Sequence, residues 1–322
     1  MKMQRPFIPA ILLALCSIAT LQAQEVLQVQ EKVQLQPKWL VGKKYTQTMD
    51  MDQTMTISFA GQDQTNKTSM AQEMTMSVTP YSKNPNYKQI TTVYEKIKMR
   101  IEMAGQILEY DSEKKDSATG PLAALGAMAG AKLTFVVDEN DKFVKFENLA
   151  KFVNAITGKN PAAGKLLENM FNEDKLKQMI NSGMLQAFPQ QPVGAGESWP
   201  FGLDVPIPQV GKMTMKGEYT LKNFEEVDGN KCAVISCDAS MGADFTGAKG
   251  AQAETFKRLG MKVEDGKMTG AFHFDPAIGY ARKVDITQKL KIRMKNPQTG
   301  QGILMPVTQK IKIALTGLGD VE

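Results

Sequence analysis

Apolar and polar residues alternate along most of the chain, beginning near Tyr45. In the stretch MDMDQTMTISF, Met49 to Phe59, every apolar residue falls on an odd-numbered position, and Asp, Thr and Ser fill the even-numbered ones. This period of two is typical of a β-strand with one buried and one solvated face. The pattern returns in Met70–Val78, Val93–Ile101, Met213–Tyr219 and Val284–Met294. The sequence therefore predicts a mainly β protein.

The predicted strands are long, and this bears on the shape of the sheet. Several alternating runs extend over about 12 to 16 residues, against the usual five or six. Long strands twist strongly, so we expect a large, curved, mainly antiparallel sheet or half-open barrel. This arrangement resembles, in architecture only, the clamshell of periplasmic lipoprotein carriers. We expect one β-rich domain over 24–322.

A helical insert interrupts the strands at about 148–182. Apolar residues recur at helical spacing over Leu149–Ile156, with Asn148 as the expected cap and Gly158 as the expected end. Pro161 and Asn172 are the expected starts of two further short helices. We expect all three to pack on the concave or open side of the sheet.

Turn residues separate the predicted strands. Ala104–Gln106, Asp138–Asp141 and Asp228–Gly229 each have the composition of a hairpin turn. The small residues of Ser117–Ala131 predict a loop or a loosely helical flap. The polar stretch Met241–Gly266 predicts no clear element.

The first 23 residues have the order of a secretory signal peptide. Lys2 and Arg5 precede an apolar run that ends before Ala23, after which cleavage is expected. A lipoprotein anchored through Cys16 is the rival interpretation, but Leu15 is larger than the residue that normally precedes a lipidated cysteine. No later apolar stretch reaches the length of a membrane span, so we expect an exported, periplasmic or secreted protein without a transmembrane span.

Two cysteines, Cys232 and Cys237, lie in a predicted strand. In an extended strand their Cα atoms are about 16 Å apart, well beyond disulfide distance. We expect both to be small buried apolar residues and not a bridge, unless the strand bulges or turns.

Methionines are numerous on the predicted inward positions, and two hypotheses follow. Thioethers bind copper(I), and Met-x-Met spacing places two sulfurs on one side of a strand. Other strands carry Val, Ile and Phe at the same positions, which favours packing or cavity lining by an adaptable side chain. We therefore expect no metal and no cofactor. The candidate ligand-lining residues are Met51, Met55, Met74, Met76 and Met99.

No catalytic constellation is visible. His273 is the single histidine, which leaves no zinc site built on several imidazoles. The stretch around Ser198, GESWP, lacks the second glycine of a nucleophile elbow. Gly158–Leu166 has the wrong spacing for a phosphate loop, and Asp138–Lys142 lacks the residues of a calcium loop. We do not expect an enzyme.

The chain carries 39 basic and 34 acidic residues, a balance that excludes little. A basic row is nevertheless predicted on one outer face, formed by Lys289, Lys291, Arg293 and Lys295. Nucleic-acid binding would require aromatic residues among them, and there are none. The row is expected to be a solvated face that blunts a sheet edge, or a surface attracted to anionic envelope components.

Three stretches resemble an uncharacterised family of exported bacterial proteins, domain of unknown function 6263. They are PKWLVGKKYTQTM at Pro37–Met49, FPQQPVGAGESW at Phe188–Trp199 and HFDPAIGYARKVD at His273–Asp285. The resemblance implies an envelope location and a β-rich fold, and it implies no activity. The sequence thus favours an exported envelope protein that binds a hydrophobic or amphiphilic ligand between sheet and helices. A structural or interaction protein with a filled core is the alternative, and copper(I) binding is a minor one.

Overall fold

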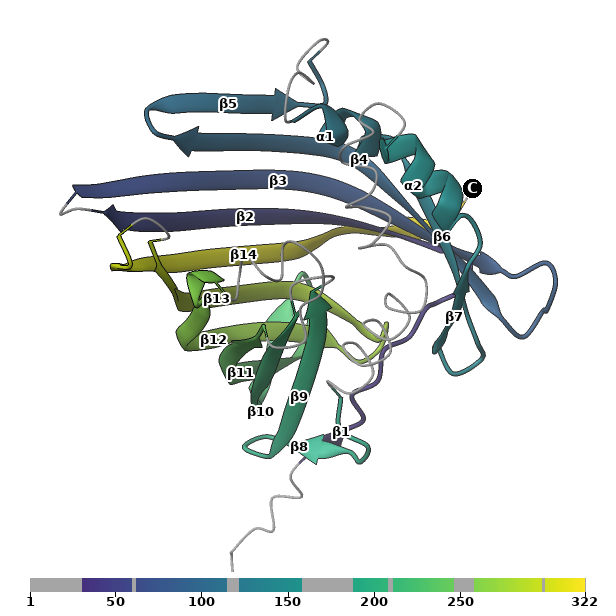
Figure 1. The fold of residues 1–322 in the computed structure, drawn as a ribbon. Helices are drawn as coiled ribbons and strands as arrows, with labels where there is room; N and C mark the ends of the chain where they lie inside the picture. The colour runs from purple at the N-terminus through teal and green to yellow at the C-terminus, as the bar shows by residue number, and fades with distance from the viewer. Residues whose placement is uncertain are drawn as a thin grey trace, which may run out of the picture. The chain divides into compact units, whose positions relative to one another are not determined.

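Antiparallel strands dominate the computed structural model, which describes residues 31–59, 62–114, 122–157, 188–207, 211–245, 258–296 and 299–321. All elements belong to one compact unit, Lys32–Glu322, and most of its strands pair in a single 12-stranded sheet. The sheet is open, with β7 and β9 at its two ends (Figure 1). The predicted large, curved, half-open antiparallel sheet is confirmed.

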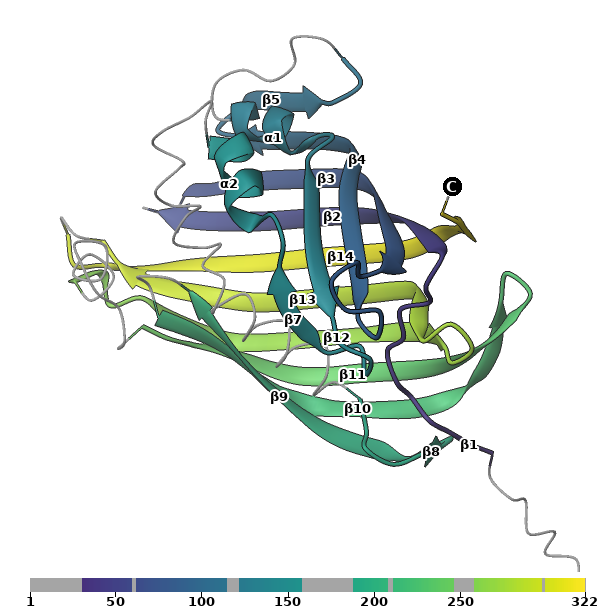
Figure 2. The same ribbon diagram turned by 90° about the vertical axis from the view of Figure 1, so that its right-hand side faces the viewer.

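Two meanders build this sheet. The first consists of β2 (Lys43–Phe59), β3 (Gln62–Pro80) and β4 (Lys88–Met103). The second runs through β9 (Ser198–Ile207), β10 (Gly211–Val227), β11 (Asn230–Asp244), β12 (Lys262–Asp275), β13 (Tyr280–Lys295) and β14 (Gly302–Asp320). The last strand, β14, pairs with β2 and joins the two meanders at the centre (Figures 1 and 2).

The edge beyond β4 is shared by two strands. The second half of β4 pairs with β5 (Gln106–Asp111), and its first half pairs with β6 (Lys132–Val137), which in turn pairs with β7 (Phe143–Phe146). The predicted turns lie where they were expected: Ala104–Gln106 between β4 and β5, Asp138–Asp141 between β6 and β7, and Asp228–Gly229 between β10 and β11. Ala104 and Gly105 have φ of 52° and 78°, and Asp228 and Gly229 have φ of 50° and 73°. Positive φ at both central residues is what a tight hairpin requires.

The strands reach 19 residues in β3 and β14. Register shifts interrupt the pairing of β3 with β4, β10 with β11, β12 with β13 and β14 with β2. A bulge adds a residue to one strand and increases the local twist. The bulges and the strand length together explain why the sheet curves.

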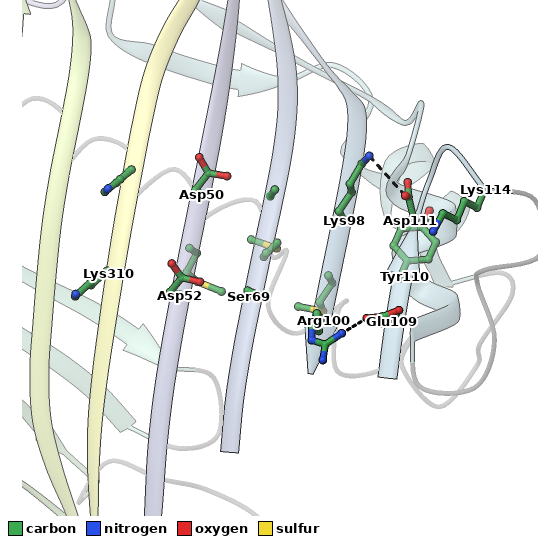
Figure 3. A pocket seen from close by; sticks show the side chains of 15 residues that line it. Asp50, Asp52, Ser69, Lys98, Arg100, Glu109, Tyr110, Asp111, Lys114 and Lys310 are labelled. Carbon is green, nitrogen blue, oxygen red and sulfur yellow. Dashed lines mark hydrogen bonds and ion pairs between the residues drawn. The ribbon is translucent and has the colours of Figure 1, made fainter. Parts of the chain in front are cut away.

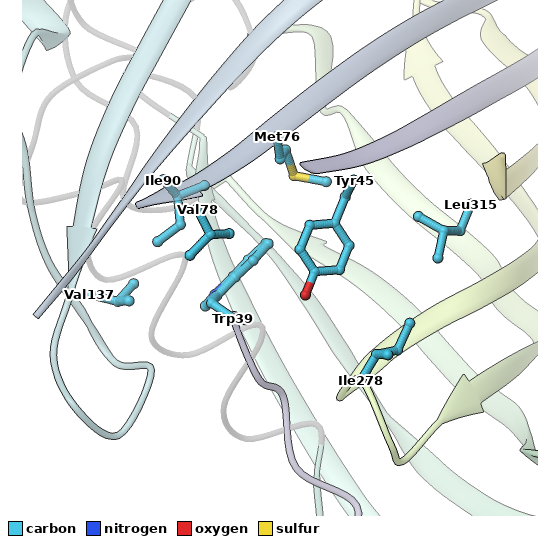
Figure 4. Packing of buried hydrophobic residues seen from close by; sticks show 8 residues of the cluster. All are labelled: Trp39, Tyr45, Met76, Val78, Ile90, Val137, Ile278 and Leu315. Carbon is cyan, nitrogen blue, oxygen red and sulfur yellow. The ribbon is translucent and has the colours of Figure 1, made fainter. Parts of the chain in front are cut away.

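The sheet has two unlike faces. We call inner the face that carries Tyr45, Met51 and Tyr94, and outer the face that carries Asp50 and Asp52. A cluster of buried apolar residues, drawn in Figure 4, lies where β2 begins: Trp39, Tyr45, Met76, Val78, Ile90, Val137, Ile278 and Leu315. The Trp39 ring meets Tyr45 edge-on, with centroids 5.8 Å apart. A strap, residues 34–42, brings Trp39 onto this face.

The strap is fixed at several points along its length. Before it, β1 (Lys32–Val33) pairs with β8 (Val193–Gly194) in a separate two-stranded sheet. The Trp39 amide then donates to Asp141 Oδ1 at 3.2 Å, in the β6–β7 turn. The Lys38 amide donates to the Gly279 carbonyl at 3.1 Å, in the β12–β13 turn. The strap therefore connects turns from both halves of the sheet.

Two short helices, α1 (Ala123–Met128) and α2 (Leu149–Thr157), are described. Phe152 of α2 is 3% exposed, and its ring stacks on Tyr94 of the inner face at 6.4 Å. The first predicted helix is thus confirmed in position and packing. Asn148 occupies the predicted cap position, since its carbonyl accepts from the Phe152 amide at 2.9 Å, but its side chain binds the backbone of Lys132 and Thr134 in β6.

Other sequence-based expectations have mixed outcomes. The two further predicted helices, the signal peptide and Cys16 lie outside the described residues. Ser117–Ala131 contains α1, as expected for a loosely helical flap. Met241–Gly266, for which the sequence predicts no clear element, is strand at both ends, because β11 continues to Asp244 and β12 begins at Lys262. Cys232 and Cys237 are buried and free, as expected.

Candidate ligand-binding site

Apolar side chains form a continuous row across the inner face. The pairing registers place Met51 between Met70 of β3 and Ile311 of β14, and the row continues in both directions. Side chains in register on one face of a sheet are neighbours. The full row is Tyr110, Met99, Met70, Met51, Ile311, Ile286, Gly270, Cys237, Tyr219 and Trp199.

The five candidate methionines all lie on this inner face, but in two environments. Met76 is 6% exposed and belongs to the packed cluster around Trp39. The other four, Met51, Met55, Met74 and Met99, are half-buried. A half-buried methionine offers an adaptable apolar surface to whatever lies against it. Their role in lining a ligand site stays a prediction.

Amide side chains accompany the methionines. Gln309 Nε2 donates to Met51 Sδ at 2.8 Å, and Gln72 Nε2 donates to Met49 Sδ at 3.7 Å. Thioether sulfur is a weak acceptor, so these contacts orient the side chains more than they stabilise the fold. A copper(I) ion at Met51 would have to displace the Gln309 amide.

An aromatic cavity of about 370 Å³ lies where the strap crosses the inner face. Its walls are almost entirely apolar. They are built by Trp39 of the strap and by inner-face residues of β9 to β14, together with Phe188: Trp199, Tyr219, Ile235, Phe272, Phe274, Tyr280, Val284 and Ile313. We refer to this space as the aromatic cavity.

Ring contacts hold the walls of the aromatic cavity in place. Trp39 and Tyr280 lie 5.9 Å apart between centroids, and Tyr219 meets Phe272 edge-on at 5.8 Å. Phe188 packs against Phe274 at 5.1 Å. Aromatic pairs at these distances are attractive beyond the area that they bury. The walls are therefore stiff, in contrast to the methionines of β2 to β4.

Few polar groups border the aromatic cavity. The Tyr280 hydroxyl donates to Gln47 Oε1 at 2.5 Å. Burial raises the pKa of Tyr280, and Tyr45 adds to the shift; burial also raises the pKa of Tyr219, with a smaller contribution from Cys237. Both phenols therefore stay neutral at physiological pH, because burial disfavours the charged form. Lys38 is the one charged residue among the described lining residues.

The aromatic residues of the cavity were missed as site candidates from the sequence. A signal was present, since Phe272 and Phe274 occupy alternate positions of one strand and Trp199 and Tyr280 lie within two of the family motifs. The methionines drew attention by repetition. The aromatic residues are dispersed along the chain and meet only in the folded sheet.

A second hollow, of about 850 Å³, lies on the outer face (Figure 3). The small residues Ser69 and Ala71 occupy its floor, since Ser69 lies between Asp52 and Arg100 in the sheet register and Ala71 between Asp50 and Lys98. Dashed lines in Figure 3 mark the pairing of Lys98 with Asp111 and of Arg100 with Glu109. The hollow is highly charged, and its charged residues are exposed or half-buried.

The predicted basic row lies on the outer face and is exposed. Lys291 pairs with Asp265 and Arg293 pairs with Glu264, each at 2.8 Å. Among the described residues, Lys289 and Lys295 have no acidic partner within 4.0 Å. Half of the row is thus neutralised, and attraction to an anionic surface stays a prediction.

His273 and Ser198, the two residues weighed for catalysis, lie apart from one another. His273 Nε2 is 3.4 Å from Glu225 Oε2, and Ser198 Oγ hydrogen-bonds Thr220 Oγ1 at 2.9 Å. Within the described ranges, no three His, Cys, Asp or Glu side chains come together as metal ligands would. Neither described helix has the length and apolar character needed to cross a membrane.

Comparison with known proteins places the chain in one family. A comparison with curated proteins gives no match in sequence. Among solved structures, lipovitellin is 12% identical with a TM-score of 0.45, and the match covers 88% of this chain and 26% of the lipovitellin chain. This chain thus spans about a quarter of the length of lipovitellin. DynF from the dynemicin biosynthesis pathway of Micromonospora chersina is 9% identical with a TM-score of 0.23, and the match covers 91% of this chain and 86% of DynF. Residues 85–281, more than half of the chain, match the family of unknown function DUF6263, and the chain therefore belongs to that family.

Proposed function

We propose that this protein binds a hydrophobic or amphiphilic ligand in the aromatic cavity, as a non-enzymatic protein of the bacterial envelope. One observation carries the proposal: about 370 Å³ of space bordered almost wholly by apolar side chains. Binding pockets for small molecules typically measure about 300 to 1,000 Å³ and combine apolar walls with few polar groups. The aromatic cavity has both properties.

The surroundings of the cavity support ligand binding over a filled core. Unoccupied apolar space loses dispersion contacts, which a ligand restores. The half-buried methionines of β2 to β4 extend the same apolar face away from the cavity and offer room for a longer chain. A scaffold with a filled core, the alternative function, would need neither feature.

Filling the cavity tests the proposal. Ala281 lines the cavity, so Ala281→Phe adds a ring where the ligand would lie. Ala271 is on the opposite, outer face of the neighbouring strand β12, so Ala271→Phe is the matched control. The measurement is the fluorescence of the neutral apolar probe N-phenyl-1-naphthylamine, titrated with the parent and both variants.

We expect the parent and Ala271→Phe to bind the probe alike, and Ala281→Phe to lose at least about tenfold in affinity, or about 1.4 kcal/mol. Urea denaturation of each variant checks that the fold is intact. Absence of probe binding by the parent, or equal binding by Ala281→Phe, would favour the scaffold. Mass spectrometry of lipids that co-purify with the parent then identifies the natural ligand.

Export to the envelope is part of the proposal and has its own test. The order of basic, apolar and small residues over 1–23 supports it. N-terminal sequencing of the exported protein is expected to begin near Gln24. An intact Met1 would contradict export by this route, and a lipid mass on Cys16 would replace the cleaved form by a lipoprotein.

A further inference from the structure

The polar border of the aromatic cavity offers hydrogen-bond donors and one positive charge. Lys38 and Gln47 both line the cavity. An ammonium group has three donors and no acceptor, and a glutamine amide has two donors on nitrogen. The acceptor of Gln47, its Oε1 atom, is already bound by the Tyr280 hydroxyl. A ligand group that accepts hydrogen bonds therefore suits this border.

Gln47 offers a second donor at the border of the cavity. Its residue is only 8% exposed, and its Nε2 atom has no hydrogen-bond partner in the described part of the protein. Because Gln47 lines the cavity, this donor is available to a ligand that enters it. An acceptor carried by a ligand in the cavity would satisfy it.

Lys38 is held at the cavity by the β12–β13 turn. Its amide donates to the Gly279 carbonyl and its Nζ atom donates to the Pro276 carbonyl at 3.2 Å. Gly279 has a φ of 62°, and a Cβ atom there would lie 2.5 Å from the Lys38 Cβ and backbone nitrogen. Only glycine allows this close approach, so the turn and Lys38 are fitted to one another.

The charge of Lys38 is not compensated. Other lysines in the same region pair with acids, such as Lys88 with Asp141 at 2.6 Å. Lys38 is half-buried and has no carboxylate within 4.0 Å among the described residues. Two of its three N–H donors remain for another acceptor.

We propose that the ligand is a single-chain amphiphile with a carboxylate head, of the fatty-acid class, whose head binds Lys38 and the Gln47 amide while its chain fills the aromatic cavity. This inference rests on the proposed function and specifies its ligand. The volume of about 370 Å³, near the lower limit for binding pockets, suits one acyl chain better than several. The uncharged aromatic walls suit the chain, and the donors of Lys38 and Gln47 suit the head.

The test compares three ligands of equal chain length that differ only in the head: decanoic acid, 1-decanol and decylamine. Each is titrated against bound N-phenyl-1-naphthylamine at about pH 8, where the carboxylate is fully ionised. We expect decanoate to displace the probe at concentrations about tenfold lower than 1-decanol, because a charge-assisted hydrogen bond is stronger than a neutral one. Decylamine is expected to bind most weakly.

Variants of Lys38 test whether its charge causes the preference for decanoate over 1-decanol. Lys38→Gln removes the charge but can still donate to the Pro276 carbonyl, and it is expected to bind acid and alcohol equally. Lys38→Arg keeps the charge, and it is expected to keep most of the preference for decanoate over 1-decanol. Lys44→Gln is the matched control, since Lys44 is exposed on the outer face of the same region and does not line the cavity. Its acid preference is expected to match that of the parent.

The outcomes separate the two proposals. Probe binding without any acid preference in the parent overturns the carboxylate inference and leaves the proposed function standing. Acid preference that persists in Lys38→Gln also overturns it. Failure of the parent to bind the probe or any of the three ligands overturns both. Added salt provides a check that needs no variant, because it is expected to weaken the binding of decanoate and not of 1-decanol.

Discussion

Removal of Asp275 is expected to destabilise the protein strongly, because Asp275 belongs to a buried ion pair. The Asp275 side chain is 2% exposed and the Arg282 side chain 11%, with Arg282 Nε donating to Asp275 Oδ2 at 2.8 Å. Asp275 Oδ1 also accepts from the Ala277 amide at 2.9 Å. These bonds shape the β12–β13 turn, whose carbonyl groups hold Lys38 at the cavity.

The magnitude follows from what Asp275→Ala leaves behind. The Arg282 guanidinium stays buried without its carboxylate, and removal of one partner from a buried pair typically costs about 3 to 5 kcal/mol. The Ala277 amide also loses its acceptor, and we count this loss within the same cost of about 3 to 5 kcal/mol, because Arg282 and Ala277 donate to the same Asp275 carboxylate. We expect the free energy of unfolding to fall by about 4 kcal/mol.

The free energy of unfolding is measured by urea denaturation. The fluorescence of Trp39 and Trp199, which are each 8% exposed, reports the unfolding. Asp285→Ala is the matched control on β13, because its pair with Lys283 is exposed and spans 3.4 Å. Exposed pairs contribute about 0 to 1 kcal/mol, so this variant is expected to change little.

A double variant isolates the pair. Asp275→Ala combined with Arg282→Met replaces the stranded guanidinium by an apolar side chain, and we expect it to recover most of the loss. The reasoning is refuted if Asp275→Ala lowers the free energy of unfolding by less than about 1 kcal/mol, the range of an exposed pair. It is equally refuted if the double variant is no more stable than Asp275→Ala.

Three further predictions concern other parts of the fold. Phe152→Ala is expected to cost about 3 to 5 kcal/mol in urea denaturation, the range for truncation of a buried aromatic residue, and an unchanged midpoint would contradict the packing of α2. Met51→Leu and Met55→Leu are expected to change stability by less than about 1.5 kcal/mol each; tight copper(I) binding by the parent that the double variant loses would establish the metal hypothesis instead. Hydrogen bonds from Lys145 and, second, from Tyr81 lower the pKa of Glu147 from its ordinary 4.5 to about 2. The contribution of this carboxylate to the free energy of unfolding is therefore fully present above pH 4.5 and is lost as the pH falls towards 2. Urea midpoints measured across this pH range are expected to fall less in Glu147→Gln than in the parent.

The face of each strand could be predicted from the sequence, because the alternation of side chains is a local property of extended backbone. Met51 was assigned inward and Lys291 outward, and both lie as expected. Hairpin turns were equally accessible. Asp228–Gly229 adopts positive φ at both residues, and such dipeptides favour that conformation without help from the rest of the fold.

Only the tertiary structure decided which strands become neighbours and which residues form the site. Alternation gives a strand two faces but does not name its partner, so the pairing of Met51 with Ile311 at the centre of the sheet had no local signal. The aromatic cavity has the same origin, since Trp39 and Tyr280 come from distant parts of the chain and meet through the strap and the β12–β13 turn. The uncompensated charge of Lys38 depends on burial and on the distance to every acid, and both quantities exist only after the sheet has curved and the strap has closed over it.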